Sequence, residues 1–382
     1  MYPNQDFEFK DCRTGGIASS LILYEGGLYR IQFKIMQRFI DSVFEKLAPH
    51  PKRIIFPDGE DSRVLEAAEE YVKLKLGPAI LLGDQDVIQK KAKELNVSLS
   101  RMLVIDPKKA SDMPLFIRRL ESLHRYKGIA DEDAHKILLN RNYFACMMLQ
   151  NGQCDGLVAG ASEYSGNILR PLFQLIKPFP GIKSISSCMI MQVPDCHYGD
   201  DGLFFLADAG VIPNPTVDQL AEIAYETARL RRQLSGKAPR VAMLSYSTKG
   251  SAQTKDSEKI IAATALARQK LYDNHIEAMI DGEMQVDAAL LQEVGSIKAP
   301  DSPVAGRADV LVFPDLNSGN IATKLIQHLT QAQAYGQIML GLSKPAAELS
   351  RGASVKDILG VAAVVALQAI EYRKLYPEQD SS

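Results

Sequence analysis

The sequence predicts an α/β protein built around a mostly parallel sheet. Short runs rich in β-branched residues alternate with helical stretches along almost the whole chain. This alternation is typical of strand–helix–strand units with right-handed crossovers. Several strand candidates are apolar without polar alternation, which indicates strands that are covered on both faces. The 382 residues are enough for two or three domains.

The first units can be followed residue by residue. A strand over Arg53–Phe56 leads through a turn at Asp58-Gly59 to a helix over Ser62–Leu76, whose apolar residues recur on one face. A strand at Ala79–Leu82 and a helix at Asp86–Leu95 repeat the unit. Further strands are expected at Leu103–Ile105, Gly156–Ala161, Ile185–Val193, Leu203–Leu206, Arg240–Ser245, Ala278–Ile280, Val310–Phe313 and Ile338–Leu342.

Two helices carry clear start or stop signals. Thr216 and Gln219 have the spacing of a capping box, and Gly236 is expected to end that helix. The last helix is expected over Ile358–Tyr372. The first 35 residues contain no clear element, so either Met36 begins the folded unit or residues 1–35 add an ordered strand; both readings remain open.

Composition excludes several classes of protein. Lys and Arg total 44 and Asp and Glu total 46, a net charge of -2 that argues against nucleic acid as the main partner. Five cysteines without a CxxC pair suit a reducing compartment, and no Cys/His spacing predicts a metal site. No apolar run is long enough for a membrane helix, and acidic residues precede the apolar stretch 17–24, so we expect a cytoplasmic protein.

The most informative segment lies near the C-terminus. The expected strand Ile338–Leu342 is followed by Ser350-Arg351-Gly352 and then Asp357, which places a hydroxyl, a guanidinium and a carboxylate at one loop-to-helix junction. Ser354 and Asp357 also fit a capping box, and on spacing alone a helix cap is the simpler interpretation. The two roles are compatible, so base, cap or both stay open for Asp357.

Three other segments are candidates for anion binding. After the strand Gly156–Ala161, Ser165 and other small residues could offer donors, with Arg170 as the charge. Gly319 and Asn320 begin a helix after Val310–Phe313, where the backbone could approach a ligand. Arg125 lies in a basic patch. Taken alone, the segments are better explained as a solvated loop, a simple turn and a charged face, respectively. Neither a Walker A loop nor a dinucleotide fingerprint is present.

Taken together, the motifs resemble the phosphate acetyltransferase family over about residues 51–376. The matching segments are Asp155–Ala161, Leu169-Arg170-Pro171, Arg240–Ser245, Ser247–Ser251, Asp281-Gly282-Glu283, Ala299–Gly306, Val312–Asp315 with Gly319-Asn320-Ile321, Lys344-Pro345, and Leu349-Ser350-Arg351-Gly352. Two positions depart from the family pattern, because Ala347-Glu348 replaces Asn-Asp and Ala353 replaces Cys.

The resemblance implies two α/β domains with a cleft between them, related to the isocitrate and isopropylmalate dehydrogenases. We expect one domain over 36–183 plus 338–382 and a second, dimer-forming domain over 184–337. The implied reaction is acetyl-CoA plus phosphate to CoA plus acetyl phosphate, in acetate metabolism, with CoA as a substrate and no bound cofactor. A phosphate butyryltransferase and a non-catalytic sensing domain are the alternatives.

The resemblance also assigns roles to residues. Ser350, Arg351 and Asp357 fall on catalytic positions, Arg125 and Arg170 on substrate-binding arginines, and Cys196 near the site. We add Ser165, Gly319, Asn320 and Lys344 as substrate-binding candidates. The expected mechanism is direct attack of the CoA thiolate on acetyl phosphate: Asp357 takes the thiol proton, Ser350 holds the sulfur, Arg351 stabilises the developing charge, and Arg125 and Arg170 clamp the phosphate.

Overall fold

The computed structural model describes residues 38–375, which form one eleven-stranded sheet flanked by helices. The strands are β1 (Ile54–Phe56), β2 (Ala79–Leu82), β3 (Met102–Ile105), β4 (Gly156–Ala159), β5 (Ser186–Gln192), β6 (Leu203–Ala207), β7 (Arg240–Leu244), β8 (Met279–Met284), β9 (Val310–Val312), β10 (Gln333–Leu340) and β11 (Ala346–Glu348). The predictions for residues 1–35 and Met36 concern residues outside this described range.

The helices connect these strands along the chain. They are α2 (Arg38–Leu47), α3 (Ser62–Lys73), α4 (Gln85–Glu94), α5 (Met113–Ser122), α6 (Asp131–Leu138), α7 (Arg141–Gln150), α8 (Ser165–Leu175), α9 (Val217–Ser235), α10 (Lys255–Asp273), α11 (Val286–Leu290), α12 (Gln292–Lys298), α13 (Leu316–Thr330) and α14 (Val355–Leu375), with 3₁₀ turns η1 (Pro107–Lys109) and η2 (His124–Tyr126). None of these helices is both long and apolar enough to cross a membrane.

The predicted α/β class is confirmed, and the predicted strands are found within a few residues of their expected bounds. Seven of the ten strand pairings are parallel. The capping box at Thr216 and Gln219 is formed, and Gly236 ends α9 in the left-handed conformation, where a side chain would be strained. The strand β11 was not predicted.

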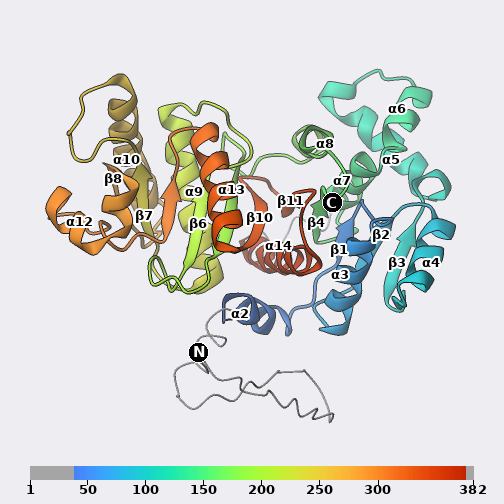
Figure 1. Ribbon diagram of the computed structural model, residues 1–382. Helices are drawn as coiled ribbons and strands as arrows, with labels where there is room; N and C mark the ends of the chain where they lie inside the picture. Colours follow the sequence, from blue (N-terminus) through green and yellow to red (C-terminus); the bar gives the residue numbers. More distant parts are fainter. Residues whose placement is uncertain (1–37, 376–382) are drawn as a thin grey trace, which may run out of the picture.

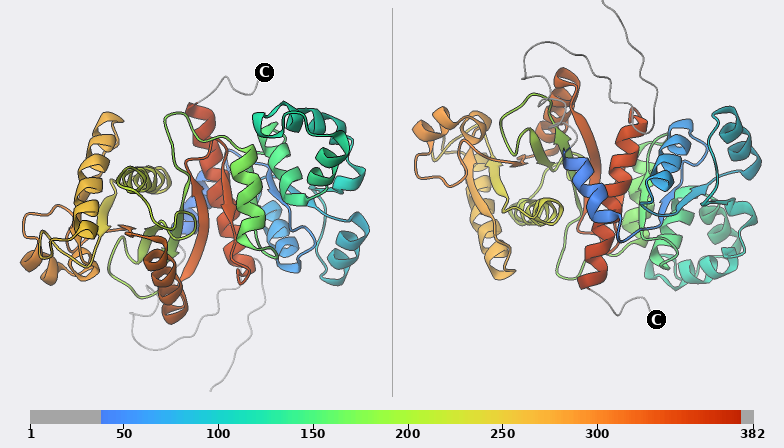
Figure 2. Two further views of the ribbon diagram at one scale, coloured as in Figure 1. Left: turned by 90° about the horizontal axis from the view of Figure 1, so that it is seen from above. Right: turned by 90° about the horizontal axis from the view of Figure 1, so that it is seen from below.

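The strand order β3-β2-β1-β4-β11-β10-β5-β6-β9-β7-β8 divides the elements into two lobes. The first lobe comprises β1–β4 with α3–α8, and the second comprises β5–β9 with α9–α13. Strands β10 and β11 and helix α14 lie between them (Figure 1), and the view from above agrees (Figure 2). The proposed domain division stays a prediction; its boundary at residues 337 and 338 falls inside β10.

The connection between the lobes is made by antiparallel strands. β10 pairs with β5 from Gln333 opposite Gln192 to Leu340 opposite Ser186, and on its other side Ile338 lies opposite Ala347 of β11. β11 then runs parallel to β4. The chain therefore returns from the second lobe and adds its last strand to the first lobe, beside β4.

Helices α2 and α14 pack across the junction of the lobes. In α2, Phe39 contacts the rings of Phe205 and Tyr335, which belong to β6 and β10. Lys46, also in α2, donates to the carbonyl of Leu234 near the end of α9 at 2.6 Å. Residues Val361–Ala366 of α14 are fully buried against the sheet. The two lobes thus share one hydrophobic core rather than being joined by a linker.

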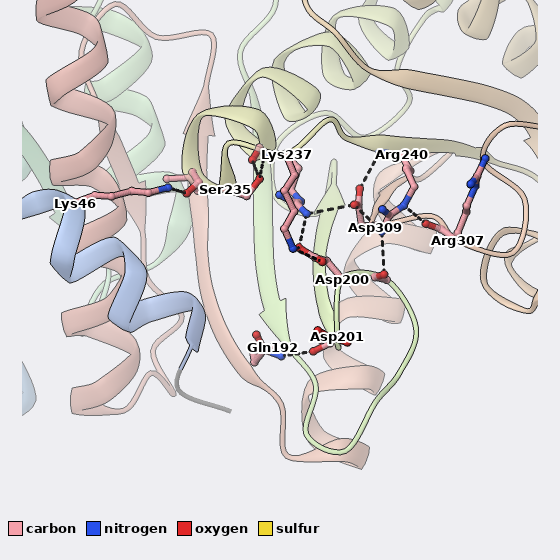
Figure 3. A network of polar contacts seen from close by, with 12 residues as sticks. Lys46, Gln192, Asp200, Asp201, Ser235, Lys237, Arg240, Arg307 and Asp309 are labelled. Atoms are coloured by element: carbon pink, nitrogen blue, oxygen red, sulfur yellow. Dashed lines mark hydrogen bonds and ion pairs between the residues drawn. The ribbon is translucent and has the colours of Figure 1, made fainter. Parts of the chain in front are cut away.

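A buried ion-pair network fixes the second lobe. Arg231 of α9 and Asp309 before β9 are both 0% exposed and lie 3.3 Å apart, and Arg231 also bonds Asp200 at 2.7 Å. Arg240 approaches Asp309 at 3.0 Å, and Lys237 reaches Asp200 from the surface at 2.7 Å (Figure 3). Burial raises the pKa of Asp309, and Arg231 opposes that shift.

We predict that Arg231→Met lowers the free energy of unfolding by about 3–5 kcal/mol, because it leaves the buried carboxylate of Asp309 without its main partner. Lys237→Met is the control, since the Lys237 side chain is 64% exposed and its ion pair should contribute at most about 1 kcal/mol. Urea unfolding of both variants measures the difference, and equal losses would contradict the prediction.

Candidate active site

The segment Leu349–Ser354 connects β11 to α14 and carries two of the predicted catalytic residues. Leu349 donates its N–H to the carbonyl of Ala159 at 2.7 Å, which ties the segment to the end of β4. The N–H of Ala353 then donates to the carbonyl of Ser350 at 2.9 Å, closing a tight turn. Ser350 and Arg351 are exposed on this turn. We call residues Ser350–Ala353 the Ser-Arg turn.

The strand before this turn differs from the sequence prediction. The expected strand Ile338–Leu342 is the end of β10, and β11 lies between it and the Ser-Arg turn. Because β11 is parallel to β4, the turn emerges at the same edge as the loop after β4. There the guanidinium of Arg351 lies 4.5 Å from the ring centroid of Tyr164, a cation–π contact that orients the charge.

Asp357 forms the capping box that the spacing predicted. Its Oδ2 accepts from the N–H of Ser354 at 2.9 Å and from its hydroxyl at 2.7 Å, and its own N–H donates to Ser354 Oγ at 3.2 Å. The carboxylate is also near Tyr335, whose pKa is raised by burial first and by Asp357 second. The cap role is therefore present, and a role as base stays a prediction.

A buried carboxylate, Glu348, lies directly before the turn and was not among the predicted site residues. Glu348 is 7% exposed and hydrogen-bonds the hydroxyl of Ser165, the first residue of α8. Burial raises its pKa, while Ser165 and the ammonium of Lys324 in α13 oppose the shift. One carboxylate thus interacts with both lobes. The only feature of the sequence that drew attention to Glu348 was its departure from the family pattern.

Gly319 and Asn320 lie in the first turn of α13, close to the end of β6. A Cβ on Gly319 would lie 2.2 Å from the carbonyl oxygen of Asp208, so glycine is required by packing between these segments. Asn320 Nδ2 donates to the carbonyl of Ala209 at 3.1 Å. The close neighbour of Gly319 is thus the chain's own backbone, and ligand binding by either residue stays a prediction.

The two arginines expected to bind substrate are exposed on the first lobe. Arg170 lies in α8 after Ser165, and Arg125 lies in the 3₁₀ turn η2. Tyr126, next to Arg125, hydrogen-bonds Gln174, one helical turn beyond Arg170. Arg170 therefore lies on α8, whose N-terminus meets Glu348, and Arg125 lies in the turn η2, which contacts α8 through Tyr126. Their contacts with a substrate stay predictions.

Lys344 lies away from the turn, whereas the position of Cys196 near the site stays a prediction. Lys344 precedes β11 and influences the thiol of Cys154 before β4, at the opposite edge of the sheet from Ser350. Six residues of extended chain span roughly 20 Å, so this placement argues against direct binding of the same reacting group. Cys196 is half-buried in the loop between β5 and β6, beyond the end of β5.

A pocket of about 330 Å³ opens beside the loop after β4. It is lined by Pro57, Asp58, Leu139, Asn140, Arg141, Asn142, Ser162 and Glu163. Asn142, one of the lining residues, is 5% exposed, and its buried Oδ1 has no hydrogen-bond partner. Because Ser162 and Glu163 directly precede Tyr164, the pocket gives room for part of a ligand beyond its reacting group.

Among residues 38–375, no group of three or more His, Cys, Asp or Glu side chains is placed to hold a metal ion. Three of the described cysteines, Cys146, Cys154 and Cys188, are buried. Burial raises the pKa of each of these thiols. They therefore remain protonated and are poor nucleophiles.

Comparison with known proteins supports one family. A family model described as phosphate acetyl/butaryl transferase matches residues 38–366. A phosphate acetyltransferase of Thermoanaerobacterium thermosaccharolyticum is 44% identical over 330 residues, which cover 86% of this chain and 99% of that protein. One from Bacillus subtilis is 39% identical, covering 88% and 100%. The crystal structure of a phosphotransacetylase from Streptococcus pyogenes superposes with a TM-score of 0.80 at 36% identity, covering 88% and 99%.

We predict that Glu348→Gln removes a pH-dependent destabilisation. The folded-state pKa of Glu348 is raised, so its contribution to stability is fully present below the unfolded pKa, about 4.3, and is lost as pH rises through the folded value. The variant should therefore gain Tm over wild type by about 1–3 °C at pH 7 and less at pH 4. Thermal melts across this range test it; a gain independent of pH would contradict it.

Proposed function

Because the chain belongs to the phosphate acetyl/butaryl transferase family, we propose that it transfers an acetyl group reversibly between CoA and inorganic phosphate. The products in one direction are acetyl phosphate and CoA. The observation that carries the proposal is the match over residues 38–366 together with the exposed Ser-Arg turn at the meeting point of the lobes.

The proposed chemistry is direct transfer without a covalent enzyme intermediate. The CoA sulfur forms a bond to the carbonyl carbon of acetyl phosphate, the bond from that carbon to the phosphate oxygen breaks, and phosphate leaves. The thiol proton passes to a base, because the thiolate is the nucleophile. The raised pKa values of the three buried cysteines support this route, since none of them offers a ready thiolate of its own.

Each residue at the site has a separate proposed role in the transfer. Ser350, exposed on the turn, holds the sulfur by a hydrogen bond. Arg351 stabilises negative charge that develops on the carbonyl oxygen and phosphate, a role that typically contributes about 3–4 kcal/mol. Its contact with the Tyr164 ring leaves the guanidinium N–H edge free for that oxygen. Arg170 of α8 and Arg125 of η2 bind phosphate groups of the substrates.

The candidate base is Asp357, in the first turn of α14. Asp357 is close in sequence to the turn, but its Oδ2 is engaged by the cap at Ser354. We propose that Asp357 accepts the thiol proton, directly or through water, while it continues to cap α14.

The activity is tested with the purified chain, CoA and acetyl phosphate. Thioester formation and phosphate release should appear together and depend on CoA. Turnover with butyryl phosphate in the same assay separates an acetyl from a butyryl transferase. Absence of turnover with either acyl phosphate, in the presence of measurable CoA binding, would favour a non-catalytic sensing domain.

Variants separate the base and cap roles of Asp357. We expect Asp357→Asn to lower kcat by roughly 100-fold or more, within the range of general-base catalysis. Ser354→Ala removes the main partner in the cap but keeps the carboxylate, so its kcat should fall only a few-fold while the two variants lose similar stability. Near-normal turnover of Asp357→Asn would leave the residue as a cap alone.

A homodimer is proposed on the exposed face of α13. Ile321, Leu325 and Leu329 are 57%, 53% and 80% exposed and recur at helical spacing, which forms an apolar stripe on one face of the helix. Asn320 and Lys324, on the same helix, interact with the chain's own site. We propose that a second copy of this chain covers the stripe. We also propose that the protein acts in cytoplasmic acetate metabolism and binds neither nucleic acid nor a membrane.

We predict that Leu325→Asp shifts the chain from dimer to monomer, because a charge at the centre of the stripe would be buried without a partner. Light scattering with size-exclusion chromatography measures the mass. Ile297→Asp is the control, since Ile297 is an 82% exposed apolar residue on α12. A monomeric wild type, or an unchanged mass for Leu325→Asp, would contradict the assignment.

A further inference from the structure

Arg63, in the first turn of α3, reaches the Ser-Arg turn from a distant part of the sequence. Its NH1 donates to the carbonyl of Arg351 at 2.7 Å and to that of Ala353 at 2.9 Å. Its NH2 donates to the carbonyl of Ala161, directly after β4, at 2.7 Å. One guanidinium thus joins the start of α3, the end of β4 and the turn that carries Ser350.

The guanidinium is itself held in place. Asp61, the N-cap residue of α3, accepts from Arg63 Nε at 3.1 Å and from NH2 at 2.8 Å. These bonds and the three to carbonyls use all five N–H donors of the side chain. Because five hydrogen bonds fix the guanidinium, the side chain has little freedom to rotate. Arginine is the residue type that carries the five N–H donors needed for these bonds.

The residues just before Arg63 also hold the loop after β4 in place. Asp58, 5% exposed and three residues before Asp61, accepts from the N–H of Gly160 at 2.8 Å and from that of Ala161 at 3.3 Å, and it also bonds Ser162. Residues 58–63 therefore hold the loop after β4 through its N–H groups and the Ser-Arg turn through its carbonyls. The relative position of Tyr164 and Arg351 depends on both sets of bonds.

We infer that Arg63 is a positioning residue for acetyl transfer, which sets the place of Ser350 and Arg351 without touching the substrate. This inference rests on the proposed function. A shift of about 1 Å in a reacting group can cost on the order of 100-fold in rate, and the Ser-Arg turn has few other bonds to the first lobe on its carbonyl side. Loss of Arg63 should therefore act on kcat rather than on substrate binding.

The chain offers a matched control at the opposite edge of the sheet. Arg53, beside the start of β1, also pairs with a carboxylate, Asp155, at 3.2 Å, and donates to the carbonyl of Gly152 at 3.0 Å. Arg53 thus makes the same kinds of contact on the first lobe but away from the turn. If Arg63 had only a structural role, replacing Arg63 and replacing Arg53 should change kcat and the hydrogen exchange of the Ser-Arg turn to a similar extent.

The experiment compares Arg63→Met, Arg63→Lys and Arg53→Met with wild type in two measurements. Steady-state kinetics with CoA and acetyl phosphate gives kcat and both KM values. Hydrogen–deuterium exchange of peptides covering residues 350–357 reports how firmly the turn is held, whether or not the protein is active. Thermal melts identify a variant that fails to fold.

We expect kcat to fall roughly 10- to 100-fold in both Arg63 variants, with KM values within about twofold of wild type. Exchange in residues 350–357 should accelerate in these variants and stay unchanged in Arg53→Met. An Arg63 variant with normal kcat, or with exchange like that of the control, overturns the inference. If wild type itself shows no acetyl transfer, the proposed function fails, and the exchange data still decide whether Arg63 holds the turn.

Discussion

The antiparallel pairing of β10 with β5 and β11 is the constraint on which the candidate site depends. Without it, the chain would consist of two separate sheets with their own helices. The pairing carries the chain from the second lobe back into the first and places β11 between β4 and β10. As a result, the loops after two parallel neighbours, β4 and β11, emerge side by side. The contact between Tyr164 and Arg351 follows from this register.

Charge around the turn is arranged by burial and by helix ends. Glu348 is buried and its pKa is raised, whereas the carboxylate of Asp357 accepts hydrogen bonds within the cap of α14. Ser165 and Lys324 approach Glu348 from different lobes, so a relative movement of the lobes would change the surroundings of this carboxylate. Arg351 stays exposed and oriented by an aromatic ring. The site therefore exposes the positive guanidinium of Arg351 to solvent, whereas the carboxylates of Glu348 and Asp357 have partners within the protein.

Sequence reasoning found what depends on local pattern. The apolar runs identified the strands, and the spacing of Thr216 and Gln219 and of Ser354 and Asp357 identified two helix caps. It missed β11, because Ala346-Ala347-Glu348 has little intrinsic preference for a strand and becomes one only between β4 and β10. Glu348, Asp58 and Arg63 were missed for a related reason, since their roles come from partners brought together by that topology. Lys344 was grouped with Ser350 by sequence proximity, although a strand separates them.

The central claim is that the Ser-Arg turn is where the reacting sulfur binds. The most direct measurement is a crystal structure of the chain with CoA bound. Our account predicts the CoA sulfur within hydrogen-bond distance of Ser350 Oγ, with the Arg351 guanidinium still over Tyr164 and facing the site of the acyl group. A thiol bound elsewhere, with Ser350 facing solvent and no contact to the turn, would contradict it.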